Sequence, residues 1–266
     1  MTALRNIAAI FGKEWRHYFG SPIAWVALAM WTLLFGFFFN FSLSYFLEMS
    51  ARAAQQQMEY GGGGGMKVSI NDYLIRSVLQ NMAVVSLFVL PMLTMRLFAE
   101  EKRQGTLELL ATSPITNLQI VMGKFVAAAA LYLLMILAGL VNVALIWVYA
   151  SNPPEWRPVL TGGLALFLVG LSFIALGLFL STLTRNQIVA GILGFGLALV
   201  FWIFSWFDQP TASAWEKLIA YLGVTTHMDD MAKGVIDLKD VVFYLSVVVF
   251  GIFLTHQSVE SQRWRA

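Results

Sequence analysis

The sequence contains no cysteine and very little charge. Of its 266 residues, only 12% are charged, whereas 59% are hydrophobic. The missing cysteine excludes disulfides, thiolate nucleophiles and cysteine metal sites. A soluble domain carries about 25% charged residues. A chain this apolar could not keep its surface hydrated, so it is predicted to lie in a lipid bilayer.

Charge is absent from six apolar runs, each about as long as the 17 to 25 residues of a membrane-spanning helix. Proton pumps and ion-coupled carriers usually keep an ionisable group at membrane depth. This chain is therefore not expected to work through an intramembrane carboxylate. The last run has a short apolar core, so five spans remain an alternative to six. The runs are Ser21–Leu47, Ser77–Met95, Phe125–Asn152, Pro158–Thr184, Asn186–Phe207 and Val241–Ser258.

Histidine is also scarce. His17, His227 and His256 all lie outside the runs or at a rim, and no run contains aspartate. Intramembrane proteases and membrane haem proteins are excluded, because they need such residues inside the spans. His227 lies beside Asp229 and Asp230, but one histidine with two acids more often marks a helix cap than a metal site. We predict neither catalytic nor metal-binding residues.

The predicted fold is an all-α integral membrane protein with six transmembrane helices. The predicted fold also includes an N-terminal interfacial helix, a cytoplasmic coupling helix between spans two and three, and short outer helices before span six. Pro91 lies inside the second span and is expected to kink it. The predicted parts are an interfacial helix at 1–20, a six-span domain at 21–258 with spans at about 21–47, 77–99, 123–150, 159–184, 187–207 and 240–257, an outer loop at 48–76, an outer helical segment at 208–240, and a tail at 259–266.

The distribution of basic residues predicts the orientation. With six spans, both termini lie on one side, which holds ten Lys and Arg against five Asp and Glu. The other side holds seven against ten. Cytoplasmic loops are enriched in Lys and Arg, so both termini are predicted to be cytoplasmic, in a bacterial inner membrane. The first apolar run is too long for the core of a cleavable signal peptide.

The segment before the first run is amphipathic. Its apolar residues recur at helical spacing, and its basic residues fall mainly on the other faces. This pattern predicts a helix in the headgroup region, ended by Gly20-Ser21-Pro22; the alternative is an ordinary basic flank. The apolar positions are Leu4, Ile7, Ala8, Phe11, Trp15, Tyr18 and Phe19.

The two longer outer loops differ in character. Five consecutive glycines at 61–65 make Gln55–Met66 a predicted flexible tether, and no P-loop pattern accompanies them. The segment 208–240 is instead patterned and partly apolar, with Trp215, Leu218, Ile219 and Leu222 at helical spacing. We expect short helices there, with Gly234 as a stop and Asp237 or Asp240 near the start of the last span.

One cytoplasmic stretch, Arg96 to Ile115, concentrates charge between two spans. Arg96 to Gln104 is predicted to prolong the second span, and Gly105 to interrupt it. Thr106 is predicted to cap a short helix through Ala111, and Ser113-Pro114 is a second helix-start signal. The stretch after Gly105 is half apolar, which favours a contact with another protein over a solvated loop.

Three motifs in this sequence resemble one family. RLFAEEKRQGTLELLATSPITNLQIVMGKF (96–125) resembles the second-span exit and coupling helix of ABC-2 type transporter permeases. FGKEWRHYFGSPIAW (11–25) resembles their N-terminal connecting helix. THMDDMAKGVIDLKDVVFYLS (226–246) resembles the last outer segment of the gliding-motility-type branch.

The resemblance implies a permease subunit that pairs with a second copy, identical or paralogous, and with two cytoplasmic ATPase subunits that bind ATP and Mg. An accessory protein in the periplasm or membrane is a further expected partner, and no nucleic acid is. The chain has no Walker A motif, so it is not itself expected to be an enzyme. The implied ATPase-coupling residues are Glu100, Glu101, Lys102, Arg103, Gly105, Thr106, Leu107, Glu108, Leu109, Leu110, Ser113 and Pro114, and the implied connecting-helix residues are Lys13, Glu14, Trp15 and Arg16.

The predicted function is that of the permease subunit of an ATP-driven transporter, for export or for signalling across the membrane. The alternative is a membrane anchor or channel-like scaffold for a periplasmic complex, without ATP coupling. The sequence leaves the substrate open. Asn40, Asn81, Asn142 and Asn186 either line a route or bond helix to helix, which is the commoner role.

Overall fold

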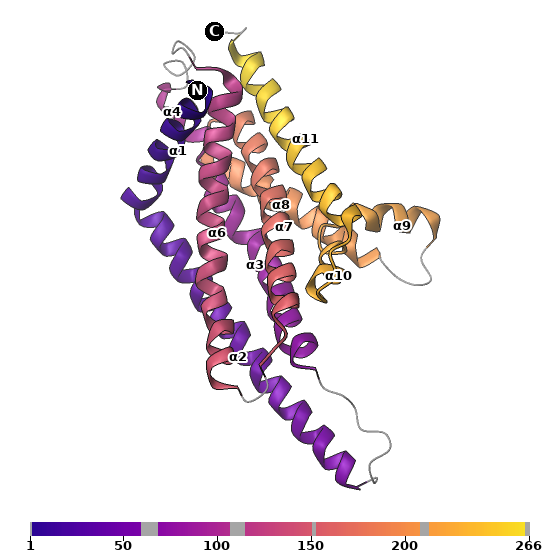
Figure 1. Ribbon diagram of the computed structural model, residues 1–266. Helices are drawn as coiled ribbons and strands as arrows, with labels where there is room; N and C mark the ends of the chain where they lie inside the picture. Colours follow the sequence, from indigo (N-terminus) through magenta and orange to yellow (C-terminus); the bar gives the residue numbers. More distant parts are fainter. Residues whose placement is uncertain (1, 60–68, 107–114, 151–152, 208–212, 264–266) are drawn as a thin grey trace.

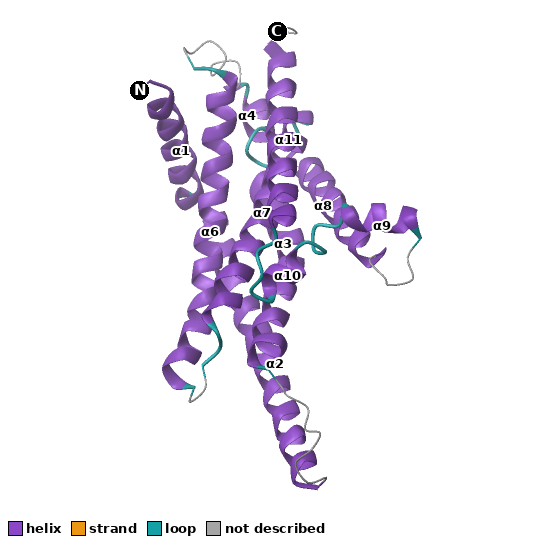
Figure 2. Cartoon of the chain, turned by 45° about the vertical axis from the view of Figure 1, so that its right-hand side comes forward, coloured by secondary structure: helices purple, strands orange, loops and turns teal. Residues whose placement is uncertain are grey.

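The computed structural model describes residues 2–59, 69–106, 115–150, 153–207 and 213–263. Within these ranges the chain forms helices joined by short connections, and no strand occurs (Figures 1 and 2). Six helical segments of the described residues are long and apolar enough to cross a membrane. The prediction of an all-α membrane protein with six candidate spans is confirmed.

The helices follow one another in this order: α1 Thr2–Gly20, α2 Pro22–Glu59, the π-helix η1 Asn71–Arg76, α3 Ser77–Thr94, α4 Ala99–Gln104, α6 Asn117–Tyr149, α7 Trp156–Leu183, α8 Gln187–Phe204, the short η2 Ser205–Phe207, α9 Ala214–Tyr221, α10 Met228–Ala232 and α11 Leu238–Arg263. The start of α1, the whole of α4 and the last turns of α11 lie at one end of the bundle (Figure 1). We call this the α4 end.

Helix α7 is the centre of the bundle, because α3, α6, α8, α10 and α11 all pack on it. A Cβ atom on Gly170 of α7 would lie 1.9 Å from Cε1 of Tyr132 in α6. The Tyr132 hydroxyl donates to the Leu166 carbonyl at 3.1 Å and lies 2.9 Å from the Ser86 hydroxyl. A small residue at position 170 therefore lets two helices approach closely enough to share polar contacts, as is common between membrane helices.

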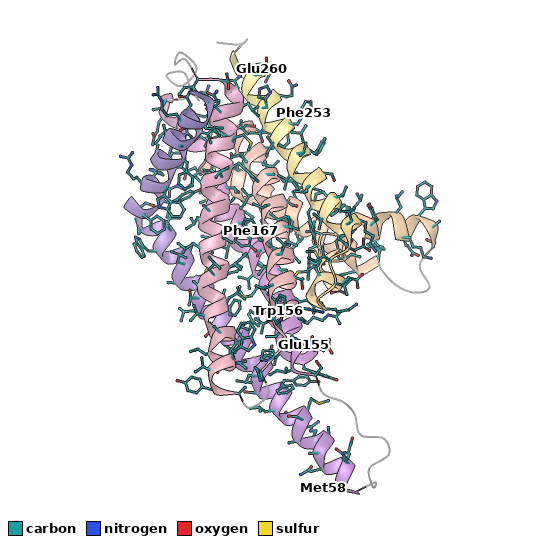
Figure 3. The ribbon with its side chains drawn as sticks, viewed as in Figure 1. Met58, Glu155, Trp156, Phe167, Phe253 and Glu260 are labelled. Carbon is teal, nitrogen blue, oxygen red and sulfur yellow. The ribbon has the colours of Figure 1, made fainter. Side chains whose placement is uncertain are left out.

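Helix α2 reaches beyond the rest of the bundle. Its 38 residues span about 57 Å at 1.5 Å per residue. Met58 marks its far tip, whereas Glu260 lies near the α4 end (Figure 3). The predicted tether at Gln55–Met66 is wrong for 55–59, which continue the helix, because Gln, Met and Glu are good helix formers. Residues 60–66 lie outside the described part of the chain.

The second span is not the continuous helix predicted through Gln104. Helix α3 ends at Thr94, turns carry the chain through 95–98, and α4 begins at Ala99. Pro91 lies one turn before this break and removes a backbone donor there. Gly105 then ends α4 with φ of 70°, as predicted, because a glycine adopts this left-handed conformation without strain.

Helix α6 begins six residues earlier than the predicted third span, at Asn117. Thr116 accepts a bond from the Gln119 amide, and the Gln119 side chain accepts one from the Thr116 amide. This capping box was readable in the sequence as Thr-x-x-Gln. The predicted start signals at Thr106 and at Ser113-Pro114 concern a helix at 107–114, outside the described residues.

The outer segment before α11 contains the expected short helices, α9 and α10. Helix α9 stands out from the side of the bundle in both ribbon views (Figures 1 and 2). Gly234, with φ of 95°, follows α10 as the predicted stop. The Asp237 carboxylate accepts a 3.0 Å bond from the Lys239 amide and so caps α11. Asp237 is one of the two residues expected near the start of the last span.

The expectation that Asp229 and Asp230 cap a helix is wrong. Both lie inside the first turn of α10, and His227, at the position before α10, makes no side-chain cap bond. Asp229 instead accepts a 2.6 Å bond from Gln80 of α3. The Asp229 carboxylate therefore bonds a side chain of another helix, whereas its local sequence predicts a bond to the backbone of α10.

Replacing Gly170 by alanine is predicted to destabilise the bundle, because the new Cβ overlaps the Tyr132 ring. Overpacking of this kind costs about 1 to 3 kcal/mol. Thermal unfolding in a fixed detergent should show Gly170→Ala melting several degrees below the wild type. The matched control is Gly163→Ala on the same helix, where the nearest atom would lie 3.7 Å away. Equal melting temperatures for the two variants would contradict the close approach.

Candidate functional site

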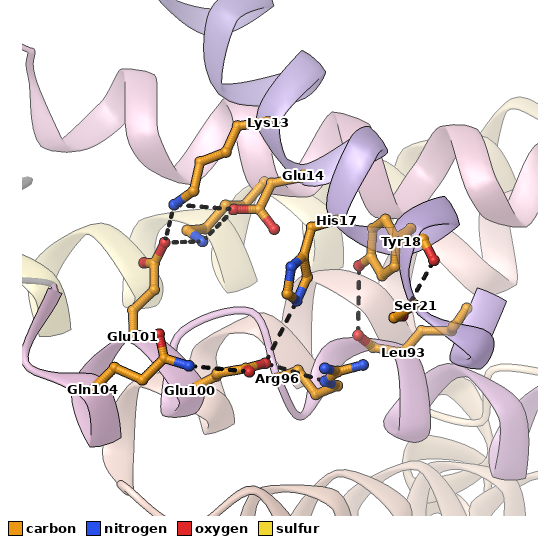
Figure 4. A network of polar contacts seen from close by, with 11 residues as sticks. Lys13, Glu14, His17, Tyr18, Ser21, Leu93, Arg96, Glu100, Glu101 and Gln104 are labelled. Carbon is orange, nitrogen blue, oxygen red and sulfur yellow. Dashed lines mark hydrogen bonds and ion pairs between the residues drawn. The ribbon is translucent and has the colours of Figure 1, made fainter.

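A group of charged residues joins three helices at the α4 end, and all of its members except Lys13 are buried (Figure 4). Lys124 of α6 is 1% exposed, and its Nζ lies 2.7 Å from Glu14 Oε1 of α1 and 2.9 Å from Glu101 Oε1 of α4. Lys13 Nζ donates to the same Glu101 oxygen at 2.7 Å. We call Lys13, Glu14, Glu101 and Lys124 the ion cluster. It ties α1 to both α4 and α6.

The ion cluster is electrically balanced, with two lysines against two glutamates. A buried ion pair gains little net stability from its attraction, because both charges lose their hydration. Removing one member is costly, because it leaves an opposite charge buried without a partner. The Phe98 ring adds a cation–π contact to Lys124. The ring centroid lies 5.2 Å from Lys124 Nζ. The cluster thus fixes how the three helices meet rather than merely holding them together.

Lys13 remains charged in this environment. Partial burial favours loss of its proton, but the hydrogen bond and the attraction from Glu101 outweigh burial and raise the pKa of Lys13 above its ordinary value. A lysine with a raised pKa is protonated throughout the physiological range. The contact between α1 and α4 is therefore ionic at neutral pH.

A second group of contacts surrounds Glu100, the neighbour of Glu101. Its carboxylate lies 3.1 Å from Arg96 Nε, 3.3 Å from Gln104 Nε2 and 3.7 Å from His17 Nε2. Arg96 and Gln104 flank Glu100 in sequence, and His17 belongs to α1. The two adjacent glutamates of α4 thus both contact α1, which restrains α4 against rotation.

Lys102 connects α4 to the other half of the bundle. Its ammonium group donates to the Thr182 carbonyl in the last turn of α7. A cation is favourable at this end of a helix, where carbonyl groups lack partners. The Thr182 hydroxyl donates at 2.7 Å to the Ser258 hydroxyl of α11. The six residues of α4 therefore contact α1, α6 and α7 directly, and α11 through α7.

The structure brings some of the predicted site residues together and leaves others apart. Lys13, Glu14, Glu100 and Glu101 meet, and Glu14 is buried within the chain. Arg103 is exposed. The remaining placements are these: exposed Arg16 donates to the Gly12 carbonyl of its own helix, Trp15 stacks on Phe11 and lies tilted against Phe19, Thr106 donates to the Glu101 carbonyl, and Gly105 ends α4.

Six predicted coupling residues lie outside the described part of the chain, so their role stays a prediction. They are Leu107, Glu108, Leu109, Leu110, Ser113 and Pro114.

Sequence reasoning missed the central residue, Lys124. It lies directly before the apolar run Phe125–Asn152 and so resembles a flanking charge, although helix α6 already starts at Asn117. The missed signal was a lone lysine placed two turns inside a capped helix and followed only by uncharged residues as far as Asn152. His17 and Arg96, which both approach Glu100, were also not assigned to the site. Among the described residues, no group of three His, Asp or Glu could hold a metal ion.

Removing the Lys124 charge is predicted to destabilise the protein strongly. Lys124→Met leaves Glu14 with only the 3.9 Å contact to Lys13 and Glu101 with only Lys13, and breaking a buried pair costs about 3 to 5 kcal/mol. Thermal unfolding in detergent measures the loss. The control is Arg52→Met, which breaks the exposed Glu48–Arg52 pair of α2 and should change stability by no more than about 0.5 kcal/mol. A Lys124 variant as stable as this control would refute the assignment.

Comparison with known proteins identifies the family. The chain is 28% identical over 177 residues to proteins named "Probable multidrug ABC transporter permease YbhR" from Escherichia coli strain K12 and from Escherichia coli O157:H7. The match covers 63% of this chain but only 44% of each relative, so the chain spans less than half of their length. The family profile described as ABC-2 family transporter protein matches residues 8–255. Because that match covers nearly the whole sequence, the chain belongs to the ABC-2 family of transporter proteins.

Proposed function

We propose that this chain is the transmembrane subunit of an ATP-driven ABC transporter and transmits force from a separate cytoplasmic ATPase. The observation that carries the proposal is the ion cluster. It ties α1 to α4 immediately before the segment that resembles a coupling helix, and so gives that segment a rigid attachment to the bundle.

This attachment is suited to transmitting a displacement of α4 to the rest of the bundle. Helix α4 is separated from α3 by the turns at 95–98 and ends at Gly105, so it can act as a short rigid body. Glu101 carries its displacement to α1 and α6, and Lys102 carries it to the end of α7. An ATPase that holds the segment 107–114 would therefore move several helices together.

The rest of the proposed assembly follows the family. Two ATPase subunits bind ATP and Mg, and a second permease copy, identical or paralogous, completes the pair. The exposed apolar residues of helix α8 support a contact with a partner or with lipid along this helix. They are Ile188, Ile192, Leu193 and Val200. The excess of basic residues at the α4 end supports a cytoplasmic location for both termini in a bacterial inner membrane. The segment 226–246 supports the gliding-motility-type branch.

A membrane scaffold without ATP coupling is the second candidate function. The observation that favours it is the length of α2, whose tip at Met58 projects past the bundle (Figure 3) and exposes Met58 by 87%. Such a projection offers a periplasmic accessory protein a contact. It does not account for the ion cluster, which lies at the opposite end, so the transporter is the stronger reading.

Reversing the charge of Glu108 tests docking. The chain is co-purified with an ATPase encoded next to it, and ATP hydrolysis is measured with and without the chain. Glu108→Lys should weaken the complex about tenfold or more, equivalent to about 1.4 kcal/mol, and lower the stimulated rate. The control Glu48→Lys changes an exposed acid at the far end and should leave both unchanged. If the wild type binds no such ATPase, or if Glu108→Lys behaves as the control does, the coupling proposal fails.

Removing Lys13 tests transmission apart from docking. Lys13→Met removes the direct Lys13–Glu101 bond between α1 and α4, while Lys124 still holds Glu101 and His17 still lies beside Glu100, so the variant should fold and bind the ATPase. Its stimulation of ATP hydrolysis should fall severalfold, because α4 is then held less firmly to α1. The control Arg5→Met removes an exposed cation about two turns earlier on the same helix. A Lys13 variant with full stimulation would show that the Lys13–Glu101 bond takes no part in transmission.

A further inference from the structure

A second polar feature lies toward the opposite end of the bundle from the ion cluster. It is a partly open cavity of about 290 Å³ lined by α3, α8, η2, the first turn of α10 and the loop that precedes α10. Gln80, which lines it, lies about 21 Å along α3 from Thr94, at 1.5 Å per residue. We call it the outer pocket. None of the coupling residues contributes to it.

The outer pocket combines an aromatic wall with hydrogen-bonding groups. Trp202 and Trp206 stand edge to face, with ring centroids 4.8 Å apart. The polar groups of the lining are those of Gln80, Thr225 and Asp229, whose side chain is a carboxylate. Amide and hydroxyl groups both donate and accept, and a carboxylate accepts. The pocket can therefore exchange several hydrogen bonds of either sense with a ligand that also covers an aromatic face.

The charges beside the outer pocket cancel one another. Asp229 Oδ1 accepts the bond from Gln80 at 2.6 Å, and Asp229 Oδ2 lies 3.3 Å from Arg76 Nη2. A cationic ligand at Asp229 would approach Arg76, and an anionic ligand at Arg76 would approach Asp229. Neither gains an unopposed counter-charge. The chemistry favours an uncharged ligand.

The loop that supplies the polar wall is held in place at several points. A Cβ atom on Gly223 would lie 2.5 Å from Ser205 Oγ, so glycine allows the loop to reach η2. Thr225 then donates to Ser205 Oγ at 2.6 Å. The Val224 amide donates to the Phe201 carbonyl at 3.3 Å. These contacts fix the loop against both α8 and η2.

A buried pair anchors the same loop to α11. His227 Nδ1 lies 2.7 Å from Asp240 Oδ1, with side-chain exposures of 4% and 2%. The other ring nitrogen lies 2.8 Å from the Tyr221 carbonyl, and Tyr244 donates to the Val224 carbonyl at 2.6 Å. A binding wall supported in this way is organised before a ligand arrives, which lowers the entropic cost of binding.

We propose that the outer pocket binds a neutral glycosyl group, a single sugar ring. Its volume of about 290 Å³ lies just below the range of about 300 to 1,000 Å³ for small-molecule sites, which suits one ring. The C–H face of the sugar packs on the Trp202–Trp206 wall, and its hydroxyls exchange hydrogen bonds with Gln80, Thr225 and Asp229. This inference goes beyond the proposed function and does not depend on it, because binding belongs to this chain alone.

Ligand-detected NMR on the full chain tests the proposal. The chain is placed in phosphatidylcholine nanodiscs that contain no glycolipid, and saturation transfer to methyl β-D-glucopyranoside is titrated. We expect a saturable signal with a dissociation constant on the order of 1 mM. Trp206→Ala and Gln80→Leu should each weaken binding about tenfold. The control is Trp215→Ala, which removes an exposed tryptophan of α9 outside the pocket.

Thermal unfolding of each variant separates loss of binding from loss of fold, and two variants from different helices guard against one of them misfolding. A signal lost in both pocket variants and kept in the control supports the site. Displacement by a glucosylated lipid assigns the sugar to a lipid headgroup, and displacement only by soluble glucoside assigns it to the aqueous phase. No saturable signal, an equal signal in all variants, or preferential binding of tetramethylammonium would each overturn the proposal. None of these outcomes bears on ATPase coupling.

Discussion

The arrangement of the α4 end depends on one buried cation. Lys124 is held by Glu14 and Glu101, and an apolar side chain in its place would leave two buried carboxylates with Lys13 as their only cation. Lys124 belongs to α6 and its ammonium group contacts α1 and α4, so the positions of the three helices cannot change independently. The neighbouring glutamate and lysine of α4 add contacts to His17 of α1 and to the end of α7. A helix of six residues thereby acquires a defined place that its own length could not secure.

Polar groups are gathered at two levels of the molecule. The ion cluster pairs two lysines with two glutamates near one end, and Arg76, Asp229 and the His227–Asp240 pair lie toward the other. Between them, helices pack through apolar side chains and close glycine contacts, as at Gly170 and Tyr132. Such a division suits a protein that must move as rigid parts, because ionic contacts break at discrete positions whereas a close-packed middle resists deformation.

Much of the architecture could be predicted from the sequence, for reasons that are local. Uncharged apolar runs of about 20 residues are long enough to cross a bilayer. The six candidate spans could therefore be predicted from the sequence. Gly105 and Gly234 marked helix ends, since both adopt positive φ. Asp237 capped α11 as its type and position suggested. Two of the errors were also local. Residues 55–59 were assigned to a glycine-rich tether although they favour helix, and the Thr116–Gln119 box that starts α6 was overlooked.

The sequence by itself determined which runs are long and apolar enough to cross a membrane and which charges flank them, because hydropathy and length depend on composition over a window. Only the tertiary structure decided which charges meet. Glu14 and Lys124 are separated by 110 positions, and nothing in their local sequence distinguishes a buried partner from a solvated flank. Asp229 shows the same principle in reverse: its sequence context suggests a helix cap, but α3 brings Gln80 and Arg76 to it. Pairing between distant helices is set by packing, and packing is decided by the whole chain at once.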